Sequence, residues 1–293
     1  MTSESPLFSI ITTTFNASST IEACILKVQE QGFADYEHLI IDGDSNDTTV
    51  DIVKRLEVKF KNIKLYSQKD KGVYDAMNKG VHFALGEWFF FLGSDDFFYS
   101  KDVLKNIAEV IKKNSSIQIV YGNVWFERLQ RFYDGRFSVD KILKHNICHQ
   151  SVFYQKDLFK QIGLFNLNYT LHADYLFNLQ CWLGGNVKHL YVNFVIANYG
   201  DGGISSIRAD DKMIEDYPEN VISIVAGGQW SSIEKIQIFS KVMRKILMRY
   251  GVFVLWQQLI KKDCNRTVKI LSLFWLPLEL IAEKIIHPIT SKK

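Results

Sequence analysis

The chain has 293 residues, of which 47% are hydrophobic and 23% are charged, and its formal net charge is +3 at pH 7. These fractions are typical of a folded globular protein and exclude a disordered one. The mild positive charge gives no reason to expect a nucleic-acid partner.

The cysteines and the N-terminus both indicate a reducing compartment. The four cysteines are scattered, with no close pair at the spacing of metal ligands, which favours buried thiols over a disulfide framework. Residues 1–6 lead directly into an apolar run, without the basic start and longer apolar core of a signal peptide. We therefore expect the catalytic part of the chain to be cytoplasmic.

The N-terminal part alternates short apolar runs with amphipathic stretches. Apolar runs at 8–14, 37–42, 63–67 and 88–92 predict strands, and the apolar spacing between them predicts helices. Ser19–Glu22 is the pattern of a capping box, and Thr48–Asp51 is expected to cap the next helix. Strands that are apolar on both faces suit a parallel sheet with helices on both sides. The sequence therefore predicts an α/β fold with a doubly wound, mostly parallel sheet.

Polar side chains gather where the predicted strands end. In chain order they are Thr13, Thr14 and Asn16, then Asp42, Asp44, Ser45 and Asp47, then Asp70 and Lys71, then Ser94, Asp95 and Asp96. Ligands of open α/β sheets bind beyond the carboxyl ends of the strands, so we expect these side chains to form one site. Carboxylates are the ligands that Mg²⁺ and Mn²⁺ prefer, often together with substrate phosphates. The acidic pair after a buried strand therefore predicts a divalent-cation site in preference to an ordinary acidic turn.

From residue 118 to about residue 199 the pattern is mixed. Apolar runs predict strands at 119–121 and 187–192, and the spacing between 173 and 183 predicts a helix with Asp174 near its start. His149 lies inside an apolar stretch. A histidine in such a place is either a satisfied core residue or a contact of the substrate.

After about residue 229 the chain becomes both basic and apolar. Apolar stretches follow at 252–260 and 268–286, and Pro277, Glu279 and Glu283 interrupt the second, which argues against a membrane-spanning helix. The tail could pack on the catalytic domain as ordinary helices. It could instead lie in a membrane interface, where lysine and arginine beside tryptophan suit anionic headgroups, and we favour this peripheral attachment.

Four segments resemble the family 2 glycosyltransferases in their order and spacing. They are Phe8–Asn16, Ile41–Thr49, Asp70–Gly80 and Gly86–Asp96. The match is closest to the branch that builds bacterial surface polysaccharides. The resemblance implies a GT-A fold and an inverting transfer of a hexose from a nucleoside-diphosphate sugar. The acceptor would be a glycan or a lipid-linked sugar, which suits attachment to the inner membrane surface.

We divide the chain accordingly into a GT-A domain at 1–228 and a basic amphipathic helical tail at 229–293. The domain would consist of a nucleotide-binding half at about 1–122 and an acceptor half at about 123–228.

The resemblance also implies roles for single residues at matching positions. Thr13 and Asp42 would contact the nucleoside, and Lys71 would lie near the base or the phosphates. Asp95 and Asp96 would divide the ribose and metal contacts between them, and we favour Asp96 on a Mn²⁺ or Mg²⁺ ion. The remaining expected contacts of the sugar nucleotide are Asn16, Asp44 and His149.

Two positions depart from the family pattern. Many relatives carry a second acid where this chain has Gly43, and an arginine where it has Met77. Because that acid often contacts the base, its replacement by Gly43 leaves the identity of the nucleotide undecided, with UDP as the default. Lys71 could make the phosphate or base contact that the arginine would otherwise make.

Asp174 matches the acid that the family uses as catalytic base at the start of a helix, with Ala173 in place of the usual glutamate. The other interpretation is an aspartate that stabilises the helix dipole. We expect Asp174 to take the proton of the acceptor hydroxyl as it attacks opposite the leaving diphosphate. A pKa raised by burial would help this step.

Two rival functions are open to such a chain. A nucleotidyltransferase on a related sheet would need a glycine-rich phosphate loop, which Thr12–Asn16 does not supply. A catalytically inactive scaffold in a polysaccharide-assembly complex would have no need of both Asp95 and Asp174. We therefore expect an active glycosyltransferase.

Overall fold

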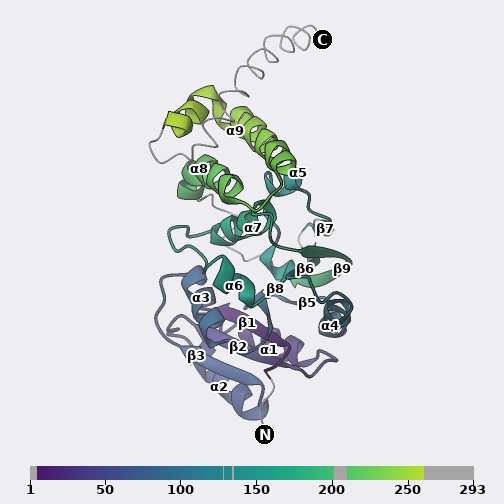
Figure 1. The fold of residues 1–293 in the computed structure, drawn as a ribbon. Coiled ribbons are helices and arrows are strands. Elements are labelled where there is room, and N and C mark those ends of the chain that lie inside the picture. Colours follow the sequence, from purple (N-terminus) through teal and green to yellow (C-terminus); the bar gives the residue numbers. More distant parts are fainter. Residues whose placement is uncertain (1–4, 128, 134, 201–209, 261–293) are drawn as a thin grey trace.

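A computed structural model describes residues 5–127, 129–133, 135–200 and 210–260, with the backbone alone for 252–260 (Figure 1). The molecule is elongated. The N-terminal strands lie at one end and the last described helices at the other.

The first four strands form the parallel part of the sheet. They are β1 (Phe8–Thr14), β2 (Tyr36–Asp42), β3 (Ile63–Ser67) and β4 (Trp88–Gly93), which confirms the four predicted strands. They pair in the order β3-β2-β1-β4, and the register places Thr13 beside Ile41 on one side and Gly93 on the other. The chain order therefore reverses between β1 and β4, the point at which ligands of such sheets bind.

Helices cover both faces of this parallel part. α3 (Val73–Phe83) packs on the face that carries Ile41, whereas α1 (Ile21–Gln29) and α2 (Thr49–Lys59) pack with Ile40 on the opposite face. Neighbouring residues of a strand point to opposite faces. Burial on both sides thus explains why β2 is one apolar run, and the doubly wound architecture is confirmed.

The rest of the sheet is mixed. Its strands are β5 (Phe97–Phe98), β6 (Ile119–Phe126), β7 (Arg131–Tyr133), β8 (Val152–Gln155) and β9 (His189–Tyr199). β8 pairs antiparallel with β4, β6 pairs antiparallel with β8, and β9 lies parallel to β6. β6 and β9 are longer than predicted, because only part of each is buried and apolar. The helical elements between these strands are α4 (Val103–Lys113), α5 (Val139–Ile142), the 3₁₀ helix η1 (His149–Ser151) and α6 (Asp157–Gln161).

The described chain ends with α7 (Ala173–Leu183), α8 (Asp211–Gly227) and α9 (Ser232–Ile260), which is kinked at Gly251. α9 packs on α8 and buries one face in the same core as α7, through Ile238, Phe239, Val242, Met243 and Ile246. The first part of the predicted tail therefore packs as an ordinary helix. The second apolar stretch, 268–286, lies outside the described residues. Among the described helices, none combines the length and the apolar character that crossing a bilayer requires.

The two predicted helix caps are wrong. α1 starts without a side-chain cap, so the box at 19–22 does not form, and Thr48 does not cap α2. Asp47 instead accepts the N–H of Thr49 at 2.9 Å and, through its other oxygen, the N–H of Ser18 at 3.1 Å. One carboxylate thereby joins the loops after β1 and β2.

Candidate functional site

A cavity of about 470 Å³ opens at the carboxyl ends of the parallel strands. The loops after β1, β2 and β3, the start of α3 and the end of β4 line it with Thr13, Thr14, Phe15, Gly43, Lys69, Asp70, Gly72, Val73, Ala76 and Ser94. Phe15 is 62% exposed, which is unusual for an aromatic side chain. A cavity of this size at the reversal of strand order suits a small-molecule ligand.

A buried carboxylate holds the loop after β2. Asp42 is fully buried and accepts hydrogen bonds from the backbone N–H groups of Asp44 and Ser45 and from the hydroxyls of Ser45 and Ser67. The side chain of Asn16 accepts a further N–H from this loop at 3.0 Å. Asn16 and Asp44 have φ angles of 51° and 70°, which Asn and Asp tolerate better than most residues. These three residues shape the rim of the cavity.

Gly43 lies against the carboxylate of Asp70, which follows β3. A Cβ at position 43 would be 2.6 Å from Asp70 Oδ2, closer than van der Waals contact allows. The other oxygen, Oδ1, accepts the N–H of Gly72 at 2.8 Å. The carboxylate that lies beside Gly43 therefore comes from the loop after β3.

Asp95 and Asp96 follow β4, and their carboxylates converge over Gly93. A Cβ on Gly93 would lie 2.5 Å from Asp96 Oδ2 and 3.1 Å from Asp95 Oδ1, so it would fill the space between them. Asp96 is 2% exposed and accepts the N–H of Gly200 at 2.7 Å and the side-chain amide of Gln150 at 2.6 Å. Burial raises the pKa of Asp96 to about 6; the charge of Asp95 adds to this effect, and the two hydrogen bonds oppose it.

The space over Gly93 fits a divalent cation. The two carboxylates offer hard oxygens around it, and a cation would offset the free-energy cost of burying a charged Asp96. Within the described residues, no group of three or more His, Cys, Asp or Glu side chains is arranged to hold a metal. A cation on Asp95 and Asp96 would therefore take its other ligands from water or from a ligand phosphate.

A second cavity, of about 280 Å³, lies between α3, η1, α7 and the ends of β6 and β9. Its lining residues are Tyr74, Phe126, Tyr133, Asn146, Ile147, Cys148, His149, Gln150, Leu171, His172, Asp174 and Tyr199. The acidic segment connects the two cavities, because Ser94 lines the first and Asp96 is hydrogen-bonded to Gln150 of the second.

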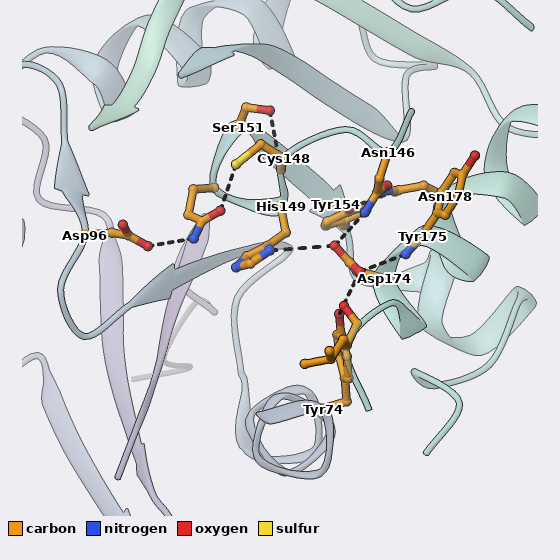
Figure 2. A network of polar contacts seen from close by, with 12 residues as sticks. Tyr74, Asp96, Asn146, Cys148, His149, Ser151, Tyr154, Asp174, Tyr175 and Asn178 are labelled. Carbon is orange, nitrogen blue, oxygen red and sulfur yellow. Dashed lines mark hydrogen bonds and ion pairs between the residues drawn. The ribbon is translucent and has the colours of Figure 1, made fainter. Parts of the chain in front are cut away.

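Asp174 lies in the second cavity, 5% exposed, at the centre of a polar network (Figure 2). Its Oδ1 accepts the hydroxyl of Tyr74 at 2.7 Å, and its Oδ2 accepts the amide of Asn146 at 2.8 Å and lies 3.6 Å from His149 Nδ1. Burial raises the pKa of Asp174, but the contacts with His149, Tyr74 and Asn146 outweigh it and leave the pKa below its ordinary value. The pKa of Asp174 is lowered and not raised, because this buried carboxylate is well supplied with donors.

The chain is similar in sequence to known enzymes. The profile described as Glycosyl transferase family 2 matches residues 9–163. Over 216 residues, the chain is 36% identical to the PGL/p-HBAD biosynthesis glycosyltransferase of Mycobacterium bovis (strain BCG / Pasteur 1173P2), which covers 73% of this chain and 84% of that protein. The chain belongs to glycosyltransferase family 2.

A second relative of this family 2 glycosyltransferase is the Escherichia coli UDP-Glc:alpha-D-GlcNAc-diphosphoundecaprenol beta-1,3-glucosyltransferase WfgD. It is 27% identical over an alignment of 239 residues, and the match covers 74% of this chain and 88% of that protein.

Solved structures share the fold of this glycosyltransferase. S. aureus TarS 1–349 in complex with UDP-GlcNAc matches with a TM-score of 0.72 and 17% identity, over 90% of this chain and 83% of that one. The mannosyltransferase PcManGT from Pyrobaculum calidifontis, in complex with GDP-Man and Mn²⁺, matches with a TM-score of 0.59 and 14% identity, over 95% and 81% of the two chains. The predicted GT-A fold is confirmed.

The predicted site residues of this glycosyltransferase fall into three places. Thr13 lines the first cavity, the acidic pair lies between the cavities, and His149 and Asp174 line the second. Asp42, Asp44 and Asn16 belong to the loops at the rim, and the exposed Lys71 is anchored by its N–H to Asp75. Their contacts with a sugar nucleotide stay predictions.

Sequence reasoning placed Asp70 after the third strand without giving it a role, and it missed three residues that hold the site's carboxylates, namely Tyr74, Asn146 and Gln150. Tyr74 follows an apolar residue at the start of a helix, where an aromatic residue is ordinarily interpreted as core. Asn146 and Gln150 flank His149 in an apolar stretch. Polar amides inside such a stretch are the one signal that could have pointed to them, because buried amides need partners.

Proposed function

We propose that this glycosyltransferase moves a sugar from a nucleoside-diphosphate donor, with UDP as the default, to a hydroxyl of a glycan or lipid-linked acceptor, with inversion at the anomeric carbon. The observation that carries the proposal is the acidic segment that joins the two cavities. A nucleotide in the first cavity would have its diphosphate beside Asp95 and Asp96. Its sugar would then face the second cavity, where Asp174 lies.

The choice of donor and acceptor is supported by the relatives. The name of WfgD contains UDP-Glc as donor and a diphosphoundecaprenol-linked sugar as acceptor, and TarS binds UDP-GlcNAc. In this chain Asp70 supplies the carboxylate beside Gly43. We infer that Asp70 contacts the base in place of the acid that relatives carry at position 43.

Asp174 is the base in this proposal. The acceptor oxygen attacks the anomeric carbon, the bond to the diphosphate oxygen breaks, and its electron pair leaves with the nucleoside diphosphate. The acceptor proton passes to Asp174. A lowered pKa keeps Asp174 ionised, and so able to accept that proton, at neutral pH.

The residues that would hold a cation are Asp95 and Asp96. When bound, Mn²⁺ or Mg²⁺ would neutralise the charge that develops on the departing diphosphate. The Mn²⁺ bound to PcManGT together with a sugar nucleotide supports this assignment.

Peripheral attachment to a membrane is part of the same proposal. The solvent face of α9 carries Ile233, Ile236 and Met248, which are 71%, 52% and 81% exposed. It also carries Arg244 and Lys241, and Lys241 is paired with Asp140 at 2.7 Å. Their spacing places all five on one side of the helix. Apolar side chains mixed with basic ones suit a surface of anionic lipids.

A thermal-shift screen tests the proposed donor class. UDP, GDP, CDP and dTDP are each added with Mn²⁺, with Mg²⁺ and with EDTA. A ligand that binds only the folded state raises the melting temperature. We expect UDP with a divalent cation to give the largest rise; no rise with any nucleotide would contradict the proposal.

A further inference from the structure

The hydroxyl of Tyr74 has a single proton to donate, but two hydrogen-bond acceptors lie within reach of it. Its oxygen lies 2.7 Å from Asp174 Oδ1 and 2.8 Å from the carbonyl oxygen of Leu171. A phenol can donate one hydrogen bond at a time, although it can also accept. Tyr74 is 6% exposed, so water does not readily replace either partner.

We propose that the Tyr74 hydroxyl switches between these acceptors as Asp174 gains and loses a proton, which makes Tyr74 a positioning residue for the base. With Asp174 ionised, the hydroxyl donates to the carboxylate, the stronger acceptor. With Asp174 protonated, the hydroxyl donates to Leu171 and its lone pair faces the neutral carboxyl group. Both protonation states of a buried base thereby keep their hydrogen bonds. The inference rests on the proposed function, in which Asp174 takes the acceptor proton.

The other contacts of Asp174 are less adaptable. The amide of Asn146 is always a donor to Oδ2, and its own oxygen accepts the amide of Asn178 at 2.9 Å, which fixes its orientation. His149 Nδ1 is farther away, at 3.6 Å. Figure 2 shows Tyr74 reaching Asp174 from the side opposite to Asn146, while His149 approaches from a third side.

The titratable groups around the pair keep Tyr74 protonated. Burial, and then the charge of Asp174, raise the pKa of Tyr74 well above its ordinary value, and Asp210 adds to the effect. Besides His149, the thiol of Cys148 and the phenol of Tyr154 also interact with Asp174, and burial raises the pKa of both. Tyr74 thus remains a neutral donor throughout the pH range in which Asp174 titrates.

Tyr74→Phe tests the switch, and Tyr175→Phe is the matched control. Tyr175 is a buried tyrosine next to Asp174 whose hydroxyl donates to the carbonyl of Ile142 at 2.8 Å. Only its backbone N–H, which the substitution keeps, donates to the carboxylate, to Oδ1 at 2.8 Å. The measurement is the pKa of the Asp174 carboxyl group, followed by carbon-13 NMR of aspartate-labelled protein and assigned with Asp174→Asn. A rate profile would also contain Asp96, whose pKa is raised to about 6. Loss of a donor destabilises the carboxylate, so Tyr74→Phe should raise the pKa of Asp174 by about one unit. Tyr175→Phe should leave that pKa unchanged.

An Asp174 pKa that is unchanged in Tyr74→Phe would reduce Tyr74 to a structural role and overturn the proposal. If Tyr74→Phe does not fold, 3-fluorotyrosine at position 74 keeps the side chain and makes the phenol more acidic. As a stronger donor it should lower the pKa of Asp174; no change, or a rise, contradicts the switch. Wild-type enzyme that turns over no sugar nucleotide would remove the proposed function as well, whereas active enzyme with an unchanged Asp174 pKa in Tyr74→Phe removes only the switch.

Discussion

At the scale of single residues, the proposed chemistry depends on the ionised form of Asp174. Asp174→Asn keeps the shape of the side chain but removes the base. A general base typically contributes about 10²- to 10⁴-fold to the rate, so we expect kcat to fall by roughly that factor while donor binding persists. Nucleotide release and equilibrium binding measure the two effects separately.

Asp216→Asn is the control for that substitution. Asp216 also accepts a tyrosine hydroxyl, from Tyr169 at 3.0 Å, but neither residue lines the two cavities. Its activity should match the wild type. Undiminished turnover in Asp174→Asn would mean that another group takes the acceptor proton.

The close approach of Gly43 to Asp70 makes a second prediction at this scale. In Gly43→Ala the new Cβ would overlap Asp70 Oδ2, and overpacking of this kind costs about 1–3 kcal/mol of the free energy of unfolding. We expect a lower melting temperature and weaker nucleotide binding. Adding Asp70→Ala should restore stability without restoring nucleotide binding. Gly43→Ala with wild-type stability would show that the loops adjust freely.

At the scale of elements, Asp47 links the start of α2 to the loop after β1. The hydrogen bonds from Thr49, and then those from Ser18, hold the pKa of Asp47 below its usual range. A carboxyl group whose pKa is lower in the folded state stabilises the fold above its unfolded pKa, and this effect is lost as the pH falls. Asp47→Ala should therefore lower the melting temperature by a few degrees at pH 7.

The difference between wild type and Asp47→Ala should shrink as the pH falls below about 4, the ordinary pKa of aspartate. Asp51→Ala removes the same charge from the first turn of α2 and serves as the control. A difference that is independent of pH, or equal in the two variants, would assign the effect to helix charge alone.

Much of the element pattern was predictable because strands buried on both faces are continuous apolar runs. β1 to β4 and α7 follow from that pattern and from helical spacing. The helix starts were not predictable from local patterns. Asp47 accepts hydrogen bonds from both Ser18 and Thr49 only because the fold brings the loops after β1 and β2 together. β6 and β9 extend beyond their apolar cores into half-exposed segments, where alternation is weak.

The candidate site was predictable in part for a similar reason. Residues that follow parallel strands converge at one edge of the sheet, so Thr13 and Asp96 could be placed together from the sequence. The contact between Tyr74 and Asp174 spans 100 residues of sequence. No local pattern contains such a pair, and the same holds for Asp96 and Gln150.

At the scale of the whole molecule, α9 presents a basic and apolar face away from the core. Co-sedimentation with vesicles tests its proposed attachment to membranes. We expect binding to vesicles that contain anionic phospholipid and little binding to neutral ones, because both apolar burial and charge contribute. Ile233→Glu with Met248→Glu should abolish binding, whereas Lys54→Glu with Val58→Glu on the exposed surface of α2 should not. Equal binding to neutral vesicles would contradict an electrostatic contribution.

The most direct test of the proposed cation site measures the release of UDP from UDP-sugars. The wild-type enzyme is compared with an Asp95→Asn, Asp96→Asn double variant, and each is measured once with Mn²⁺ and once with EDTA. Because a cation between these carboxylates would stabilise the departing diphosphate, we predict release only by the wild type, and only when the cation is present. Release that is equally fast in the double variant and in EDTA would contradict the central claim.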